Sequence, residues 1–406
     1  MTIKKIHFLT LTMLTGLIFL CSGCNKKEDV SLTIWVQEEE YSMVTEAVEQ
    51  FKKENKNTAK LDINIHNESF NTVKNVILSN PKAAADVYVF TDDQFLDLKN
   101  SNVLLPVTVD KDEVIANCGG QDTLIIDTIY KDEHLYGYPS TASNGYFLYY
   151  NKDYYTEEDV QQLDTILDIA ADNNKYFVMD WTSGWYLYSF FGGAGKIITA
   201  DTSTGKNLCD FNSTTGPYSG LDITNAMLDI ANHPGFSTVA DSNLVNSVAN
   251  GDVIAMVSGT WYANTFQDIL GDKLGACKLP TYTVHDTQVQ MASFAGFKYY
   301  GINPNTSYPE WSQKLASYLT NYDNQLARFE AAGECPSNVK ASETDAVQQS
   351  VAIGALKKQL PYATVQNVYE TYWDPMAAFG CYIASGNPDN KDLQELLDET
   401  VEQITK

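Results

Sequence analysis

Residues 31–36 have the sequence Ser-Leu-Thr-Ile-Trp-Val, a strand-like run. A segment with apolar residues at helical spacing follows, and this strand-then-helix order occurs three times before residue 100. The strands are predicted at 31–36, 61–65 and 85–90, and the helices at 44–51, 70–79 and 94–99. Strands alternating with helices of about ten residues predict an open α/β sheet, whose ligands bind beyond the carboxyl ends of the strands. Phe90-Thr-Asp-Asp93 is such an end.

A second lobe is expected downstream. The stretch 135–145 is rich in small and turn-forming residues, and we interpret it as the first crossing between two lobes. New helical patterns follow at 157–171 and 219–232. The part of the chain after residue 23 is longer than a single hydrophobic core usually supports, because domains typically contain about 100–200 residues.

The chain begins with a predicted lipoprotein leader. Lys4 and Lys5 precede an apolar run over 7–20, which ends at Cys21-Ser-Gly-Cys24. This pattern is typical of an export signal, too short for a membrane span, after which Cys24 becomes the lipidated first residue and 25–30 a tether. Cys21 stands where such signals usually have Leu, so an ordinary secretory signal is the alternative.

Charge and cysteines exclude several classes. The net charge of −25 becomes more negative by two once Lys4 and Lys5 leave, which disfavours nucleic acid and anionic lipid as partners. Five further cysteines lack the close pairing of metal sites or a disulfide framework, so we expect buried free thiols, with one bridged pair as a possibility. They are Cys118, Cys209, Cys277, Cys335 and Cys381.

Aromatic residues beside turns point to a ligand surface. Trp181-Thr-Ser-Gly-Trp185-Tyr186 and Ser258-Gly-Thr-Trp261-Tyr262 place aromatics in or after turns, where side chains often face a cleft. Aromatic faces suit sugar rings, and Asp, Asn and Gln suit sugar hydroxyls. For any single Trp, a place in the core is the simpler interpretation.

The ordered blocks of the chain resemble those of extracellular solute-binding proteins of ABC sugar importers, of the maltose/maltodextrin-binding type. The blocks are Leu32-Thr-Ile-Trp-Val, Ala85-Asp-Val-Tyr-Val-Phe, Asn102-Val-Leu-Leu-Pro-Val, Tyr136-Gly-Tyr-Pro, Tyr149-Tyr-Asn-Lys-Asp153, 251–261, Lys278-Leu-Pro-Thr, Gly301-Ile-Asn-Pro and Ile383-Ala-Ser-Gly386. The resemblance implies two α/β lobes that close on a ligand by a hinge. It places 31–142 and 290–340 in the N-terminal lobe, and 143–289 and 341–406 in the C-terminal lobe.

The resemblance also implies site residues. Stacking aromatics would be Trp185, Tyr186, Trp261 and Trp373, with Phe90 where the maltose-type protein has Trp; polar contacts would come from Asp93, Glu39, Glu40 and Asn144. Gln94 and Asn144 stand where that type has arginine and glutamate, and the loop at 39–40 lacks its lysine. Malto-oligosaccharides are the expected ligand, and another oligosaccharide remains open.

We therefore expect a monomeric, non-enzymatic binding protein without cofactor or metal. It would serve an ABC permease from the outer face of the cytoplasmic membrane, anchored by lipid alone. The alternatives are a binding protein for another solute and a glycoside hydrolase, for which Asp92 and Asp93 are weak candidates. The chain has no G-x-S-x-G elbow and no H-E-x-x-H, and 192–196 is interpreted as a helix end rather than a phosphate loop.

Overall fold

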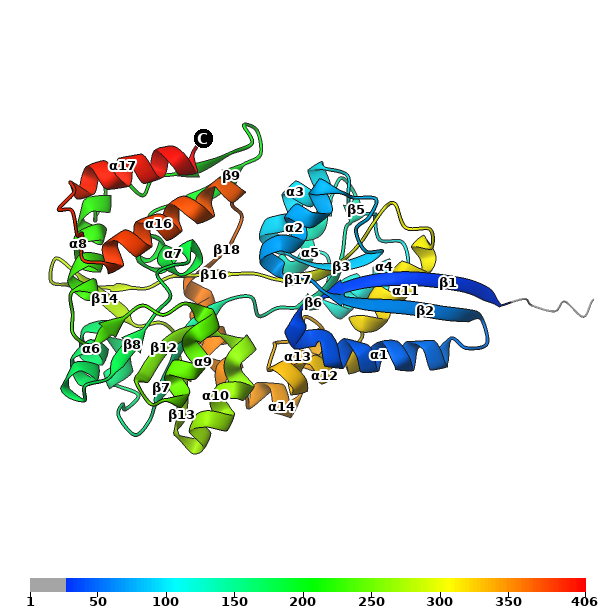
Figure 1. The fold of residues 1–406 in the computed structure, drawn as a ribbon, viewed down its shortest axis with the longest axis horizontal. Coiled ribbons are helices and arrows are strands. Elements are labelled where there is room, and N and C mark those ends of the chain that lie inside the picture. The colour runs from blue at the N-terminus through cyan, green and yellow to red at the C-terminus, as the bar shows by residue number, and fades with distance from the viewer. Residues whose placement is uncertain (1–26) are drawn as a thin grey trace, which may run out of the picture.

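The computed structural model describes residues 27–406 and consists of two α/β lobes joined by a narrow waist (Figure 1). The predicted leader and its lipidation site Cys24 lie outside the described residues. The N-terminal lobe is built on a five-stranded mixed sheet in the order β2-β1-β3-β17-β6. Its strands are β1 (Glu28–Val36), β2 (Ala59–Asn67), β3 (Val87–Thr91), β6 (Tyr138–Thr141) and β17 (Lys298–Ile302). Its helices are α1 (Tyr41–Glu54), α2 (Phe70–Ser79), α3 (Phe95–Asn100), α4 (Lys111–Asn117), α5 (Leu124–Ile129), α11 (Pro309–Leu319) and α12 (Tyr322–Ala332).

The C-terminal lobe contains a second five-stranded sheet in the order β11-β8-β12-β7-β13. Its strands are β7 (Tyr146–Asn151), β8 (Tyr176–Val178), β11 (Phe236–Ser237), β12 (Val253–Gly259) and β13 (Leu274–Cys277), with hairpins β9 (Ile198–Asp201)–β10 (Lys206–Cys209) and β14 (Thr281–Val284)–β15 (Thr287–Gln290). Its helices are α6 (Leu163–Asp172), α7 (Gly184–Gly193), α8 (Gly220–Ala231), α9 (Asp241–Ala249), α10 (Ala263–Leu270), α15 (Val351–Gln359), α16 (Trp373–Ala384) and α17 (Leu393–Ile404).

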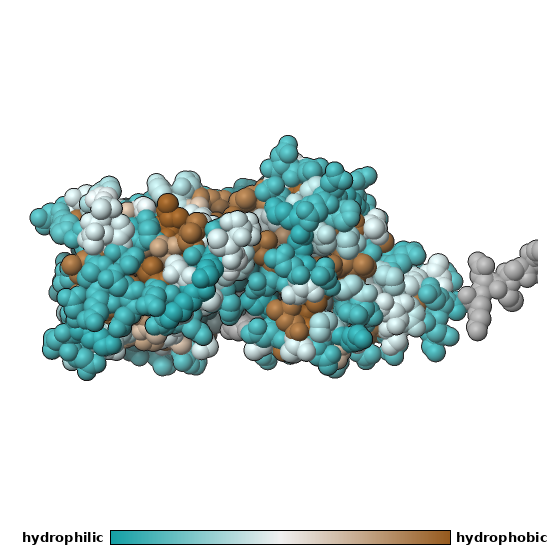
Figure 2. Space-filling model, turned by 90° about the horizontal axis from the view of Figure 1, so that it is seen from above, coloured by the Kyte–Doolittle hydropathy of each residue, from teal (hydrophilic) through white to brown (hydrophobic). Residues whose placement is uncertain are grey.

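Each lobe has its own apolar core. Every residue of β3 and of β12 is buried, as expected for central strands covered on both faces. Val30, Leu32, Ile34 and Val36 of β1 are buried, while the residues between them are partly or fully exposed. The predicted two-lobed α/β fold is thus confirmed. Hydrophilic residues cover most of the face in Figure 2, with small apolar patches on both lobes.

The waist is a hinge of irregular segments and one short strand pair. β16 (Ser293–Ala295) and β18 (Ala363–Val365) run parallel, and the Asn144 N–H donates to the Gly296 carbonyl, 3.2 Å away. A third passage includes the short helices α13 (Val339–Ser342) and α14 (Asp345–Gln348). The strands before 142 and those within 146–277 fall into separate sheets, which supports the proposed lobe boundaries.

Two local predictions need correction. The helix predicted from residue 157 begins at Leu163, because 159–161 form a 3-10 turn and Gln162 is extended, with φ −127°. The predicted first crossing contains β6, which pairs with β17, so the chain leaves the N-terminal lobe only after Thr141. The segment 192–196 does end a helix, since α7 stops at Gly193.

All five cysteines of the described residues are free thiols; Cys118 and Cys335 are buried, whereas Cys381 is exposed, contrary to the expectation. Within 27–406, no helix has the length and apolar character needed to cross a bilayer. No group of three His, Cys, Asp or Glu side chains in the same range could hold a metal ion.

Candidate functional site

The buried side-chain amide of Gln366 links the two lobes. The Gln366 side chain, on the segment after β18, is 3% exposed. Its Nε2 donates to Oδ1 of Asp92 (2.9 Å) and Oδ1 of Asp93 (3.1 Å), both in the N-terminal lobe. Its Oε1 accepts from the Trp185 indole of the C-terminal lobe, 2.6 Å away. Gln366 therefore brings the predicted residues Asp93 and Trp185 together at the boundary between the lobes.

Trp185 and Trp261 form an aromatic pair on the C-terminal lobe. Their ring centroids lie 5.8 Å apart, and both side chains are partly exposed. Asp241, the first residue of α9, holds the second ring, since its Oδ2 accepts from the Trp261 indole at 3.1 Å. Its Oδ1 accepts from the hydroxyls of Tyr186 (3.0 Å) and Ser258 (3.1 Å). Burial raises the pKa of Asp241, and these three donors oppose that shift.

Position 259, two residues before Trp261, has room only for glycine. Trp261 lies in the 3-10 helix η4 (Thr260–Tyr262), directly after the buried strand β12. A Cβ on Gly259 would lie 1.9 Å from the Trp261 ring, closer than any two such atoms can approach. Gly259 therefore allows the indole to fold back over the backbone at the carboxyl end of the strand.

Trp373 lies beside the hinge. It opens α16, is partly exposed, and its ring contacts Tyr372 (centroids 4.9 Å apart) and Phe294 of β16 (6.1 Å). Tyr146 joins the hinge to the aromatic pair, because its hydroxyl accepts from the Phe294 N–H (3.3 Å) and donates to the Trp185 carbonyl (2.9 Å). We call Trp185, Trp261 and Trp373 together the aromatic surface. Movement of β16 would therefore displace both Trp373 and the Trp185 backbone, which lie at its two ends.

Asp92 and Asp93 form an acidic pair at the end of β3. Asp92 is 6% exposed; its Oδ1 also accepts from the Phe297 N–H at 3.1 Å, while its buried Oδ2 has no partner among the described residues. Burial, and next the charge of Asp93, hold the pKa of Asp92 well above its usual value. Burial also raises the pKa of Asp93, opposed by its hydrogen bond from Thr91. The pair thus favours retention of a proton, which could be donated to a polar ligand.

Three other residues named from the sequence are buried and do not offer a free surface to a ligand. Phe90 is 0% exposed and stacks on Tyr299 in the N-terminal core. Tyr186 is 3% exposed, so in this conformation it supports Asp241 rather than offering a ring face. Glu40 is 3% exposed beside the Arg328 guanidinium, 3.5 Å away, and burial raises its pKa.

The two remaining residues lie in connecting segments. Asn144 is partly exposed in the first crossing, and its side-chain amide makes no hydrogen bond within residues 27–406. Glu39 lies in the 3-10 helix η1 (Glu38–Glu40), and its side chain is outside the described set.

The sequence interpretation missed three groups. Gln366 and Asp241 carry no motif, and only their distant partners reveal them. The third is a second contact between the lobes, in which Lys74 of α2 pairs with Asp97 (3.0 Å) and, across the boundary, with Glu370. The pairing acids raise the pKa of Lys74 against the opposing effect of burial, which is the largest single influence on it.

Comparison with known proteins agrees with this architecture. A family model of bacterial extracellular solute-binding proteins matches residues 46–355. The chain belongs to this family. The protein is therefore a binding protein and not an enzyme, which confirms that prediction.

Individual relatives of this solute-binding protein are distant. Two proteins from strains of Streptococcus pneumoniae, each described as a maltooligosaccharide ABC transporter solute-binding lipoprotein, are 24% identical over 289 residues. The match covers 66% of this chain and 66% of theirs, so it spans slightly less than two thirds of their length.

Several solved structures share the fold. One, determined with acarbose, has a TM-score of 0.80 at 24% identity and covers 93% of this chain and 99% of its own. The ligand-free maltodextrin-binding protein of L. casei BL23 gives 0.76 at 21% identity, with the same two coverages. The maltotriose-binding protein of Thermus thermophilus, bound with maltotriose, gives 0.75 at 16%, covering 92% of this chain and 98% of its own. At these identities the likeness establishes the fold alone.

Proposed function

We propose that this solute-binding protein captures malto-oligosaccharides between its lobes and delivers them to an ABC permease, from a lipid anchor on Cys24. The main support is the arrangement around Gln366, which joins a partly exposed Trp pair of one lobe to an acidic pair of the other. Aromatic rings can stack on the faces of sugar rings, and carboxylates can accept hydrogen bonds from sugar hydroxyls. The two relatives from Streptococcus pneumoniae, which are described as solute-binding lipoproteins of maltooligosaccharide transporters, support this proposal.

The proposed contacts fall into two sets. Trp185, Trp261 and Trp373 would supply the stacking faces. Asp93 and Asn144 would supply polar contacts, with Tyr186 as a positioning residue that holds Asp241. Phe90 and Glu40 are left out, because both are buried among protein partners.

A different oligosaccharide is the second candidate, and one observation favours it. Gln94 stands where the maltose-type site has arginine, and here Gln94 is 7% exposed and forms a capping box with Thr91. The polar partners on the N-terminal side therefore differ from the maltose-type set, whereas Trp185, Trp261 and Trp373 stand at the aromatic positions that the resemblance implies.

Isothermal titration calorimetry of residues 25–406 separates these candidates. The titrants are maltose, maltotriose and longer α-1,4-glucans, with β-linked oligosaccharides and free amino acids as controls. Binding of α-glucans supports the maltodextrin proposal. Binding of another oligosaccharide alone would move the specificity, and no heat with any sugar would refute the carbohydrate proposal.

A further inference from the structure

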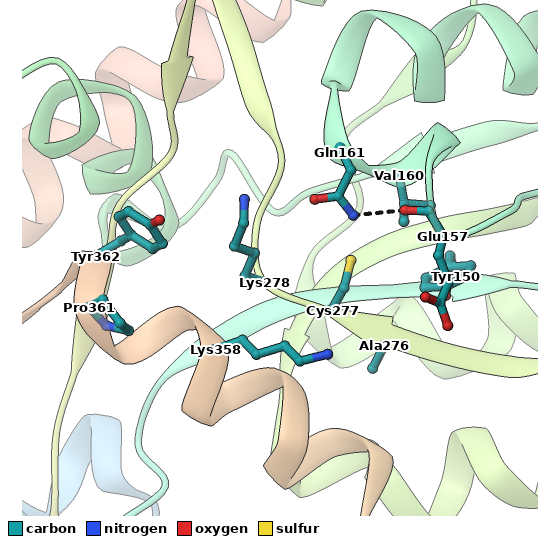
Figure 3. Close-up of a pocket in the computed structure, with 10 residues that line it drawn as sticks. All are labelled: Tyr150, Glu157, Val160, Gln161, Ala276, Cys277, Lys278, Lys358, Pro361 and Tyr362. Carbon is teal, nitrogen blue, oxygen red and sulfur yellow. Dashed lines mark hydrogen bonds between the residues drawn. The ribbon is translucent and has the colours of Figure 1, made fainter.

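A cavity of about 350 Å³ opens on the C-terminal lobe, apart from the aromatic surface (Figure 3). Its walls come from the end of β13, the turn at 157–161, and the end of α15 with the following 3-10 helix η6 (Leu360–Tyr362). The residues around it include Tyr150, Glu157, Gln161, Cys277, Lys278, Lys358 and Tyr362. Its volume lies at the lower end of the usual range for small-molecule sites, roughly 300–1,000 Å³.

Two lysines face this cavity without a carboxylate partner. Neither Lys278 nor Lys358 forms an ion pair within residues 27–406, although acidic residues outnumber basic ones by 52 to 27 in the chain. Lys278 is partly buried, its Nζ donates to Gln290, and its ammonium lies 5.6 Å from the centre of the Tyr362 ring. Burial lowers the pKa of Lys278. A partly desolvated ammonium whose protein partners are neutral amide and carbonyl oxygens favours a nearby anion.

The ammonium groups of Lys278 and Lys358 both lie near Cys277 in the cavity wall. Both ammonium groups lower the pKa of the Cys277 thiol, against a larger increase caused by burial that brings it to about 12. Figure 3 shows the Lys358 amine directed toward Cys277, with Lys278 on the neighbouring wall and the Glu157 carboxylate on the far side beside Tyr150. The positive side of the cavity is therefore the side formed by the two lysines and Tyr362.

We propose that this cavity is a second binding site, for a small organic anion that carries a phosphate or several carboxylates. Lys278 and Lys358 neutralise the oxyanion, and the Tyr362 ring packs on the organic part. The Gln161 Nε2 donates to the Glu157 carbonyl, 2.7 Å away, which leaves its Oε1 to accept from a ligand hydroxyl. The site is independent of the proposed sugar surface, because no residue is shared between the two.

The cavity also lies where both hinge strands enter the C-terminal lobe. Tyr362 directly precedes β18, and Gln290, the partner of Lys278, lies three residues before β16. The Gln290 amide donates in turn to the carbonyls of Leu279 (2.7 Å) and Met291 (3.1 Å), so the lysine is part of the wall that carries the hinge strand.

The test is calorimetry on residues 25–406 at low ionic strength with citrate, glucose 6-phosphate and inorganic phosphate, and with glucose as the neutral control. We expect one of the anions to bind at a single site and to weaken as NaCl is added. If glucose 6-phosphate binds more tightly than phosphate, the ligand of the cavity is of the sugar phosphate class. If citrate binds most tightly, the ligand is a polycarboxylate.

Variants locate the site. Lys358→Gln should weaken anion binding about fivefold, the effect of losing one exposed charge contact, and Lys278→Gln at least as much. The matched control is Lys357→Gln, which removes the same charge from the adjacent position of α15 but lies outside the cavity. Within residues 27–406 the exposed Lys358 side chain makes no hydrogen bond, so its variant should fold even if Lys278→Gln does not.

The result that overturns the proposal is the absence of heat with all three anions, or binding that Lys358→Gln and Lys357→Gln weaken equally. Trp261→Ala should leave anion binding unchanged. Failure of the anion site can therefore be distinguished from failure of the sugar proposal.

Discussion

Replacement of Gln366 by alanine should open the protein. The amide makes three hydrogen bonds across the boundary, to Asp92, Asp93 and Trp185. A buried polar group left unpaired costs about 1–3 kcal/mol. The Trp185 indole and Asp93 are partly exposed, so water can replace the lost partner there, whereas Asp92 is buried. We therefore expect the closed arrangement to lose about 2–3 kcal/mol, which lowers the closed-to-open ratio about 30- to 150-fold.

The free energy of unfolding should change by much less than the roughly 2–3 kcal/mol lost from closure. The reason is that water hydrates Asp92, Asp93 and the Trp185 indole once the lobes separate. Gln366→Glu should have the larger effect, since it places a third carboxylate against Asp92 and Asp93. Asn367→Ala is the matched control, because the side chain of this neighbour is exposed.

Small-angle X-ray scattering of the ligand-free protein measures the opening, and calorimetry measures the affinity for the sugar that binds. Gln366→Ala and Gln366→Glu should increase the radius of gyration and weaken sugar binding, since the ligand must then supply the free energy of closure. If both variants keep the wild-type radius of gyration and sugar affinity, Gln366 does not stabilise the closed arrangement and this prediction is wrong.

Three further predictions concern the aromatic surface and the acidic pair. Trp261→Ala or Trp373→Ala should weaken sugar binding by about 1–3 kcal/mol while the fold stays intact, as checked by circular dichroism; unchanged affinity in both variants would refute the site. Gly259→Ala should displace the Trp261 ring and reduce sugar affinity and alter tryptophan fluorescence, whereas a wild-type spectrum would contradict the close contact. Asp92→Asn should stabilise the protein increasingly as the pH rises above about 4, the pKa of an aspartate in the unfolded chain. The raised pKa makes folded Asp92 keep a proton that the unfolded chain releases, so its contribution to stability falls above that pH. Thermal unfolding at several pH values tests this against the exposed control Asp62→Asn, and a difference from wild type that does not change with pH would contradict it.

The fold could be predicted because its signals are local. Alternating strand and helix patterns located β1, β2, β3, α1, α2 and α8 closely, and the position of Asp93 after a buried strand placed it at the boundary between the lobes. The glycine before Trp261 was also visible, although the reason for it, the space taken by the indole, appears only in three dimensions.

The polar part of the site could not be predicted, because its residues meet only after folding. Gln366 and Asp92 are 274 positions apart, and neither has a neighbour in sequence that indicates the pairing. Phe90 illustrates the opposite error. The resemblance placed it where the maltose-type protein has a stacking Trp, but its ring packs on Tyr299 inside the sheet layer.

The interlobe contacts also explain why the two lobes would respond to one ligand as a unit. Gln366 and Glu370 lie on one short segment between β18 and α16, and they bind Asp92, Asp93 and Lys74 of the N-terminal lobe. The same segment leads directly into Trp373. A sugar that stacks on Trp373 would therefore hold the segment whose side chains make the contacts of the closed arrangement. Ligand binding and closure would be coupled through these few residues, without a rearrangement of either core.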